Sequence, residues 1–364
     1  MRTSGKSVGS ARITGYPEQL GGHCGSGAMR DLLTWAGLDW GSPLSEGLVF
    51  GLGGALTFMY LRVPDLGTPI YLVGRNADFE ANVCSRLGIT TSRKQTDDPG
   101  LAWRWVTHQL DQGQPVMLNA DIAFLPYLRV RLSNTRHDIV VIGYDENAGT
   151  VTVVDNDRLD PQVLSIDDLD RARSSIGFPD PVRYATWPMR FPSELPDLET
   201  AARSAAQESA RGMREGAGQS LDPLARPGSS VTGSGLPGLD TFATDLRSWP
   251  QTMDAESLAQ SRQALAVFIE KAGTGGGLFR RLQAQFCKDA ASLLDSEAFA
   301  LAGRSWTDAA RVWSELAAAA SNDSVPQSDL ADLANELVNI ERSACGDLER
   351  AATSSWHGDV RIDR

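Results

Sequence analysis

Apolar positions in the first half of the chain recur with the period of an amphipathic helix in three places. One face follows the i, i+3, i+4, i+7 spacing and consists of Met29, Leu32, Leu33 and Ala36. Gly37 comes directly after this face, at the position where a glycine commonly ends a helix. The same period predicts two further helices, over residues 79–87 and 101–112.

Short, nearly continuous apolar runs predict three strands, over residues 116–120, 139–144 and 150–154. The segment between the last two runs, 145–149, has the residues of a hairpin connection. Helices and strands that mix in this way predict an α+β domain. We place it at residues 15–192, behind a flexible N-terminus at 1–14.

The second half of the chain has a different composition. Residues 193–238 are expected to be a linker with one helix, at 201–214, and a flexible loop rich in Gly, Ser and Pro. From 239 to 356 the pattern is helical, and one long apolar stripe marks its end. The stripe consists of Leu330, Leu333, Leu337, Ile340, Ala344 and Leu348. We expect an all-α C-terminal domain.

Composition narrows the class of protein. The chain has 364 residues and a formal net charge of −12, which argues against a nucleic-acid binder. Its four cysteines are too widely spaced for a disulfide framework or a metal-binding pair. The longest apolar stretch, 48–61, is shorter than the roughly 20 residues that cross a bilayer. The N-terminus lacks the apolar core of a signal peptide. We expect a cytoplasmic protein without membrane contact, and leave a homodimer open.

Cys24 carries the clearest chemical signal. It lies at the expected start of the first helix, where unpaired backbone N–H groups favour the thiolate that acts as a nucleophile. His137 opens one predicted strand, and Asp155 ends the next one. Nucleophilic catalysis by a thiol needs a base beside it and a group that orients the base. We therefore expect Cys24, His137 and Asp155 to form a catalytic triad.

Two of these residues also have a structural interpretation. Cys24 would then be a buried thiol of the core, and His137 a hydrogen-bonded core histidine. Asp138 competes with Asp155 for the histidine, but strand alternation sends its side chain to the opposite face from His137. Asp157 shares the face of Asp155 and is the second candidate for the orienting acid.

Two residues upstream of the thiol are candidates for the substrate pocket. His23 either contacts the substrate or its oxyanion, or caps the local turn. Gln19 is the nearest upstream amide and could donate to an oxyanion.

Two glycine-rich segments have alternative uses. Residues 51–54 lack the Lys-Ser/Thr of a phosphate-binding loop, so we expect a helix to approach the backbone closely there. Residues 273–277 precede Arg280 and Arg281. They either present N–H groups to an anion such as a pantetheine phosphate, or form a turn between helices.

Three arginines lie just upstream of His137 in this acidic chain, namely Arg129, Arg131 and Arg136. They could dock an acidic carrier protein, or form a solvated edge.

Several blocks of the sequence resemble the butirosin biosynthesis protein H family. The most specific blocks are His23-Cys24-Gly25-Ser26-Gly27-Ala28-Met29-Arg30 and the run from Leu44 to Gly54. Leu125-Pro126-Tyr127 and the strand that ends in Gly143-Tyr144-Asp145 add to the likeness. The second half resembles the helical domain that accompanies this family, chiefly at residues 273–281.

The resemblance implies a papain-like, cysteine-peptidase-like fold and an acyltransferase of natural-product biosynthesis. Such an enzyme moves an acyl or aminoacyl group from a carrier-protein thioester to an acceptor amine. By resemblance, Cys24 is the nucleophile, His137 the base and Asp155 the orienting acid. The matching blocks and their surroundings add substrate-binding candidates, namely Ser45, Glu46, Asp121, Tyr127 and Arg280.

These expectations include an acyl carrier protein, which brings the acyl group on its 4′-phosphopantetheine, and a small-molecule or peptide amine. No metal and no cofactor of the chain's own are expected. Two other functions stay open. One is a cysteine peptidase or amidase on the same fold, and the other is a non-catalytic scaffold that binds a peptide or a carrier.

Overall fold

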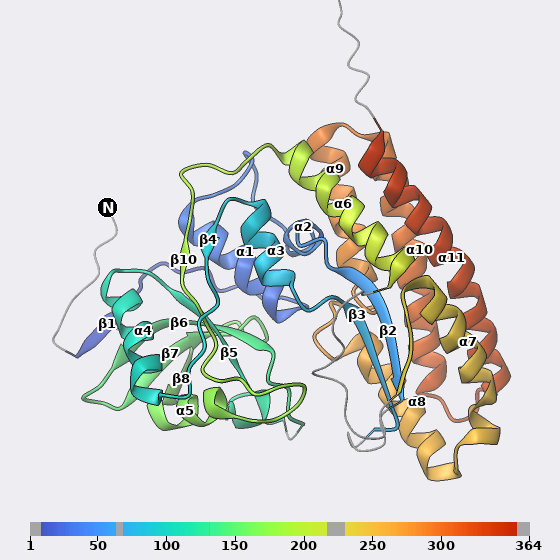
Figure 1. The fold of residues 1–364 in the computed structure, drawn as a ribbon, viewed down its shortest axis with the longest axis horizontal. Helices are drawn as coiled ribbons and strands as arrows, with labels where there is room; N and C mark the ends of the chain where they lie inside the picture. Colours follow the sequence, from blue (N-terminus) through green and yellow to red (C-terminus); the bar gives the residue numbers. More distant parts are fainter. Residues whose placement is uncertain (1–8, 63–67, 131, 217–229, 355–364) are drawn as a thin grey trace, which may run out of the picture.

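The computed structural model describes residues 9–62, 68–130, 132–216 and 230–354. Within these ranges the chain has a mixed α+β part and a helical part that lie side by side (Figure 1). None of the helices there is long and apolar enough to cross a lipid bilayer.

An antiparallel sheet of six strands forms the centre of the α+β part. Strand β6 is its longest member and pairs with β5, β7 and β1. The strands are β1 (Ser10–Arg12), β5 (Val116–Ala120), β6 (His137–Asp145), β7 (Thr150–Val154), β8 (Gln162–Ser165) and β9 (Thr186–Trp187). The predicted strands at 116–120 and 150–154 are confirmed without a shift, and the run at 139–144 lies inside β6.

Helices α1, α4 and α5 contact this sheet. Helix α3 packs against α1 and α2 (Glu46–Leu52), and it also contacts β4 of the short pair β4–β10. Their bounds are α1 (Cys24–Ala36), α3 (Phe79–Arg86), β4 (Thr90–Thr91), α4 (Pro99–Asp111), a 3-10 turn (Ile122–Phe124), α5 (Ile166–Ser174) and β10 (Met189–Arg190). Gly37 ends α1 in the left-handed conformation, as the sequence predicts. Its φ of 74° is one that glycine adopts at little cost.

A second sheet has the strand order β11-β2-β3 and consists of β2 (Leu56–Arg62), β3 (Ile70–Arg75) and β11 (Ser230–Ser234). This sheet was not predicted from the sequence. Every residue of β2 up to Leu61 is buried, so the segment shows no alternation of apolar and polar positions. Strand β11 corrects part of the predicted flexible loop at 216–238, because residues 230–234 pair with β2. Residues 217–229 of that loop lie outside the described ranges.

The helical part packs on this second sheet through three helices, α6 (Leu198–Glu215), α7 (Gly235–Thr252) and α8 (Ala255–Glu270). Behind them lie α9 (Arg280–Leu294), α10 (Glu297–Ala320) and α11 (Gln327–Thr353). The expectation of helices without strands after residue 239 agrees with the described residues.

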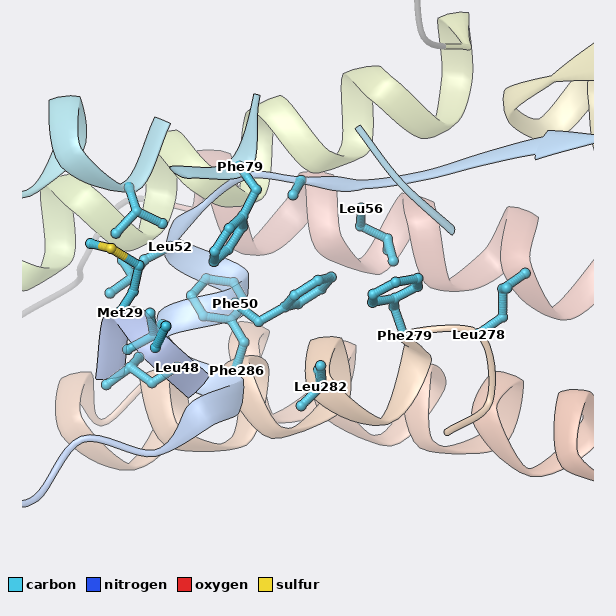
Figure 2. Packing of buried hydrophobic residues seen from close by; sticks show 14 of the residues in the cluster. Met29, Leu48, Phe50, Leu52, Leu56, Phe79, Leu278, Phe279, Leu282 and Phe286 are labelled. Carbon is cyan, nitrogen blue, oxygen red and sulfur yellow. The ribbon is translucent and has the colours of Figure 1, made fainter. Parts of the chain in front are cut away.

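Helix α2 (Glu46–Leu52) connects the two parts and packs along α9. A Cβ at Gly51 would overlap the ring of Phe286, which confirms that these glycines permit a close approach. Phe50 and Phe79 stack near Phe279 and join the core of the α+β part to that of the helices (Figure 2). One continuous hydrophobic core therefore extends through both parts, and α2 lies next to the turn that carries Cys24.

Candidate active site

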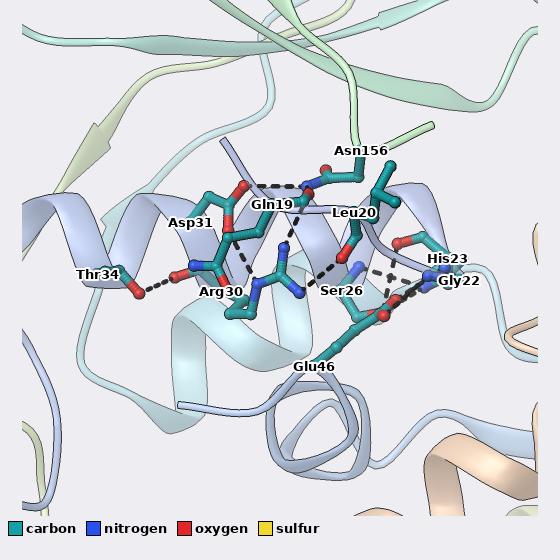
Figure 3. Close-up of polar contacts among 10 residues, drawn as sticks. All are labelled: Gln19, Leu20, Gly22, His23, Ser26, Arg30, Asp31, Thr34, Glu46 and Asn156. Carbon is teal, nitrogen blue, oxygen red and sulfur yellow. Dashed lines mark hydrogen bonds and ion pairs between the residues drawn. The ribbon is translucent and has the colours of Figure 1, made fainter. Parts of the chain in front are cut away.

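Cys24 is the first residue of α1, and the turn before it is tightly held (Figure 3). His23 caps the helix, because its Nδ1 accepts a hydrogen bond from the backbone N–H of Ser26 at 3.2 Å. The carboxylate of Glu46, at the start of α2, accepts from the N–H of Gly22 at 2.8 Å and from that of His23 at 2.7 Å. These contacts fix where the helix starts, and so where the sulfur lies.

A second ring of contacts holds the segment that leads into this turn (Figure 3). The buried guanidinium of Arg30 donates to the carbonyls of Gln19 and Leu20, both at 3.0 Å. The amide of Asn156 donates to the same Gln19 carbonyl at 2.9 Å and to Asp31 at 3.0 Å. Gln19 thus contributes its backbone, while its side chain is exposed.

His137 and Asp155 meet at the ends of β6 and β7. The Nε2 atom of His137 lies 2.7 Å from Oδ2 of Asp155, and this oxygen also accepts from the hydroxyl of Tyr127 at 2.9 Å. The side chain of His137 is 14% exposed and that of Asp155 is fully buried. Burial would raise the pKa of Asp155, but the charge and hydrogen bond of His137 lower it below its usual value. Asp155 therefore carries a buried negative charge against the imidazole.

The thiol of Cys24 faces the same imidazole. Burial alone would raise the pKa of Cys24, but the hydrogen bond and positive charge of His137, with a smaller effect of Arg75, lower it. Burial would likewise lower the pKa of His137, yet Asp155 and the hydrogen bond with Cys24 hold it well above its usual value. Since Nε2 is engaged by Asp155, Nδ1 is the ring nitrogen left for Cys24. The groups favour a thiolate–imidazolium pair.

The other three cysteines lack these features. Cys24 is partly exposed, whereas Cys84, Cys287 and Cys345 are buried. Burial raises the pKa of Cys84 and of Cys345 to about 12, and it also raises the pKa of Cys287. Only the thiolate is an effective nucleophile. Cys24 is therefore the cysteine that is suited to attack an acyl group.

A second acid, Asp138, contacts Cys24. The thiol of Cys24 donates toward its Oδ2 at 3.9 Å, and Asn119 donates to its Oδ1 at 2.7 Å. Glu80 is close by, because a Cβ at Gly25 would lie 2.9 Å from Oε1 of Glu80 and 3.1 Å from Oδ2 of Asp138. Burial, then Glu80, then Cys24 raise the pKa of Asp138 well above its usual value. The site thus holds a buried carboxyl group with a raised pKa beside the sulfur.

Strand alternation predicts only part of this arrangement. His137, not Asp138, contacts Asp155, as the alternation indicates. The thiol comes from a different element and lies against both residues at the end of the strand. Asp138 had been considered only as the orienting acid. Glu80, Asn119 and Arg75 were missed as site residues, because their roles depend on long-range contacts that leave no local pattern.

His23 contacts three phenylalanine rings, those of Phe50, Phe79 and Phe279. It is 3% exposed, and its Nε2 has no hydrogen-bond partner among the described residues. Burial lowers the pKa of His23 well below its usual value, with smaller effects of Arg75 and His137. Its place as a neutral helix cap agrees with the capping interpretation.

The remaining candidates for substrate binding differ in how they relate to Cys24, His137 and Asp155. Ser45 caps α2 and donates to Asp289. Asp121 accepts hydrogen bonds from Ser133 and Ser175, and so ties loops together. Tyr127 reaches the triad through Asp155.

Arg280 is fully buried in the helical part. It donates to Glu341 at 2.6 and 2.8 Å and to the carbonyl of Thr57 at 3.2 Å. Its guanidinium joins α9, α11 and β2 and is closed off from solvent.

The arginines upstream of His137 differ from one another. Arg136 pairs with Asp180 at 2.8 Å, Arg129 is exposed, and Arg131 lies outside the described residues. No group of three or more His, Cys, Asp or Glu side chains is placed to hold a metal ion in the part of the chain that the structure describes.

Two family models match the chain. Residues 23–156, which contain the whole Cys24–His137–Asp155 constellation, match the model of butirosin biosynthesis protein H, N-terminal. Residues 167–348 match a domain of unknown function. Residues 23–156 therefore belong to the family of the butirosin biosynthesis protein H N-terminal domain. No curated protein matches it.

Membership of the family bears out the resemblance seen in the sequence blocks, and the N-terminal match covers every residue of the proposed triad. At the level of the family it indicates an enzyme of biosynthesis with acyltransferase activity.

Proposed function

We propose that this chain is a cysteine-dependent N-acyltransferase with a papain-like catalytic domain. It takes an acyl or aminoacyl group from a thioester on an acyl carrier protein and passes it to an amine. The observation that carries the proposal is the contact of His137 with both Asp155, at 2.7 Å, and the thiol of Cys24, whose pKa is lowered.

The first step forms the acyl-enzyme. The thiolate of Cys24 attacks the carbonyl carbon of the incoming thioester, and a carbon–sulfur bond forms as the carbonyl oxygen becomes an oxyanion. The intermediate then collapses, the bond to the pantetheine sulfur breaks, and the imidazolium of His137 gives its proton to the leaving thiol. One thioester replaces another, so little driving force is needed.

The oxyanion has donors at the start of α1. The N–H groups of Cys24 and Gly25 belong to the first helical turn, where helix geometry provides no intrahelical acceptor. The carboxyl group of Asp138 lies against the sulfur, and in its protonated form it would donate a further hydrogen bond to the same oxygen. This gives the oxyanion role to Asp138, in place of the side chain of Gln19.

The second step forms the amide. The acceptor amine attacks the acyl group on Cys24, and the neutral imidazole of His137 removes the proton from its nitrogen. The bond to Cys24 breaks, and the thiolate–imidazolium pair is restored. Asp155 keeps the ring oriented and stabilises its charge throughout. If water took the place of the amine, the same site would act as a hydrolase.

Intact mass measurement with an acyl-pantetheine thioester tests this function. We expect the wild-type chain to gain one acyl group and to lose it to an added amine, with the amide as product. Cys24→Ser should not gain the thioester-linked group, whereas Cys84→Ser, which changes a buried thiol, serves as the matched control. Release of free acid at the same rate with and without amine would favour a peptidase or amidase. No acylation of the wild type would favour a scaffold.

A further inference from the structure

The glycine-rich turn of the helical part, residues 273–277, lies directly on the turn that precedes Cys24. The N–H of Gly275 donates to the carbonyl of Gly22 at 2.9 Å. A Cβ at Gly22 would lie 2.5 Å from Cα of Gly275. The two backbones are therefore in contact two residues before the nucleophile, with no room for a side chain between them.

A second contact reaches the residue beside the nucleophile. Phe279 follows the glycine-rich turn, and its ring lies edge-on to the imidazole of His23 with the centroids 5.4 Å apart. It also stacks on Phe50 at 5.5 Å (Figure 2). Leu278 and Phe279 have backbone φ values of 51° and 71°, which residues other than glycine rarely adopt. Such a conformation persists only where the surroundings impose it.

A third route passes through α2. Its Gly47 N–H donates to Oε1 of Gln285 on α9 at 3.2 Å. The neighbouring Glu46 accepts from the N–H of Gly22 and of His23 and from the hydroxyl of Ser26. Helix α9 thus holds α2, and α2 holds the turn that ends at Cys24. The contacts that the helical part makes with the turn before Cys24 therefore come from α9 and from the glycine-rich turn that precedes it.

We infer that the helical domain, whose family model has no assigned function, positions the nucleophile of the catalytic domain. Gly22, Gly275 and Phe279 are the positioning residues. They act through the start of α1, which sets both the N–H groups near the sulfur and the contact of Cys24 with His137. The inference rests on the proposed function in that it takes Cys24 as the nucleophile.

The alkylation of Cys24 tests this inference without any substrate. Gly22→Ala inserts one methyl group where the two backbones touch. Phe279→Leu removes the ring from His23 and keeps the position apolar. In both variants we expect the apparent pKa of the thiol to rise and iodoacetamide labelling of Cys24 at neutral pH to slow by about tenfold or more, because misplacement of about 1 Å is costly at such sites.

Gly273→Asn is the matched control. Gly273 lies in the same turn with φ of 67° and with no atom within 4 Å of an added Cβ, and asparagine tolerates this conformation. It should label like the wild type. Far-UV circular dichroism and thermal melting show which variants are folded. If Gly22→Ala does not fold, the labelling rate of Phe279→Leu tests the inference.

The two proposals fail in different ways. If folded variants at Gly22 and Phe279 kept the labelling rate and the pH profile of the wild type, the positioning role would be overturned. The proposed role of Cys24 as the nucleophile would not be affected. If Cys24 of the wild type were no faster than the buried cysteines, the proposed function itself would be contradicted. If labelling of Cys24 slowed as much in Gly273→Asn as in Gly22→Ala, the inference would also be overturned. Any disturbance of the glycine-rich turn would then be enough to slow labelling.

Discussion

The carboxyl group of Asp138 lies against the sulfur of Cys24, with 3.9 Å between Oδ2 and Sγ. Ionised, it would repel the thiolate that the mechanism needs. The groups that face it are Cys24 from α1, Arg75 from β3, Glu80 from α3, Asn119 from β5 and the adjacent His137. Burial and the carboxyl of Glu80 raise the pKa of Asp138, so the neutral acid is the form that fits beside a thiolate.

Substitution of Asp138 separates its hydrogen bonds from its charge. Asp138→Asn keeps a neutral group with N–H donors, and we expect it to retain most of kcat. Asp138→Leu removes the donor to the oxyanion and should lower kcat by about a hundredfold. Turnover of an acyl-pantetheine thioester with saturating amine measures both. Equal activity in the leucine variant and the wild type would rule out a catalytic role for this acid.

Tyr127 acts on the chemistry through Asp155. Its hydroxyl donates to the same Oδ2 atom that binds His137. Tyr127→Phe removes this hydrogen bond to a charged group, and kcat should fall by roughly three- to tenfold with KM unchanged. Steady-state kinetics with an acyl-pantetheine donor measure the effect. A change confined to KM would instead indicate that Tyr127 contacts the substrate.

The buried pair of Arg280 and Glu341 stabilises the helical part and its junction with β2. Arg280→Met leaves the carboxylate of Glu341 buried without its partner and should lower the free energy of unfolding by about 3–5 kcal/mol. Arg280→Met/Glu341→Leu removes both charges and should recover much of that loss. Urea denaturation measures each variant. If Arg280→Met were as stable as the wild type and had a raised KM, the result would instead indicate that Arg280 binds the substrate.

Arg129 is an exposed arginine of the loop before His137, and Phe124 and Val130, 43% and 38% exposed, are nearby in sequence. If this loop meets an acidic carrier protein, Arg129→Glu should raise KM for a carrier-bound donor and leave KM for free acyl-pantetheine unchanged.

Arg190→Glu provides the matched charge reversal for this test. Arg190 lines a surface hollow with Trp35 and Ala36, at the far end of α1 from Cys24, and should leave both KM values unchanged. Equal KM values for carrier-bound donor in the Arg129 variant and the wild type would remove this loop from the docking surface.

The sequence predicted the elements whose pattern is local. Strands β5 and β7 are short apolar runs bounded by turn residues, and α1 has both its face and its glycine stop. Strand β2 was missed because its segment is buried on both sides and follows the glycines of α2. Strand β11 comes from a stretch of small polar residues, which pairs because β2 offers it an edge.

The same distinction applies to the site. Cys24, His137 and Asp155 could be found because a helix start and a hairpin place them predictably. The raised pKa of Asp138 depends on its burial in the folded chain and on Glu80, which comes from α3. The contact of Gly275 with Gly22 joins residues more than two hundred positions apart, and no local pattern in either glycine-rich segment could reveal it.

The pH dependence of alkylation follows from the two opposite pKa shifts. The pKa of Cys24 lies below its usual value in the folded chain, so the thiolate forms at lower pH than for a free thiol. The pKa of His137 is raised, so the imidazolium persists as pH increases. The reactive ion pair should therefore occupy the window between these two apparent values, which belong to the coupled pair.

The rate of iodoacetamide labelling at each cysteine, followed by mass spectrometry as pH is raised, tests the central claim most directly. We expect Cys24 to label well ahead of Cys84, Cys287 and Cys345, with a rate that already levels off below the usual pKa of a thiol, about 8.5. His137→Gln should shift this profile toward alkaline pH. Slow labelling of all four cysteines together, or an unshifted profile in His137→Gln, would contradict a thiolate activated by His137.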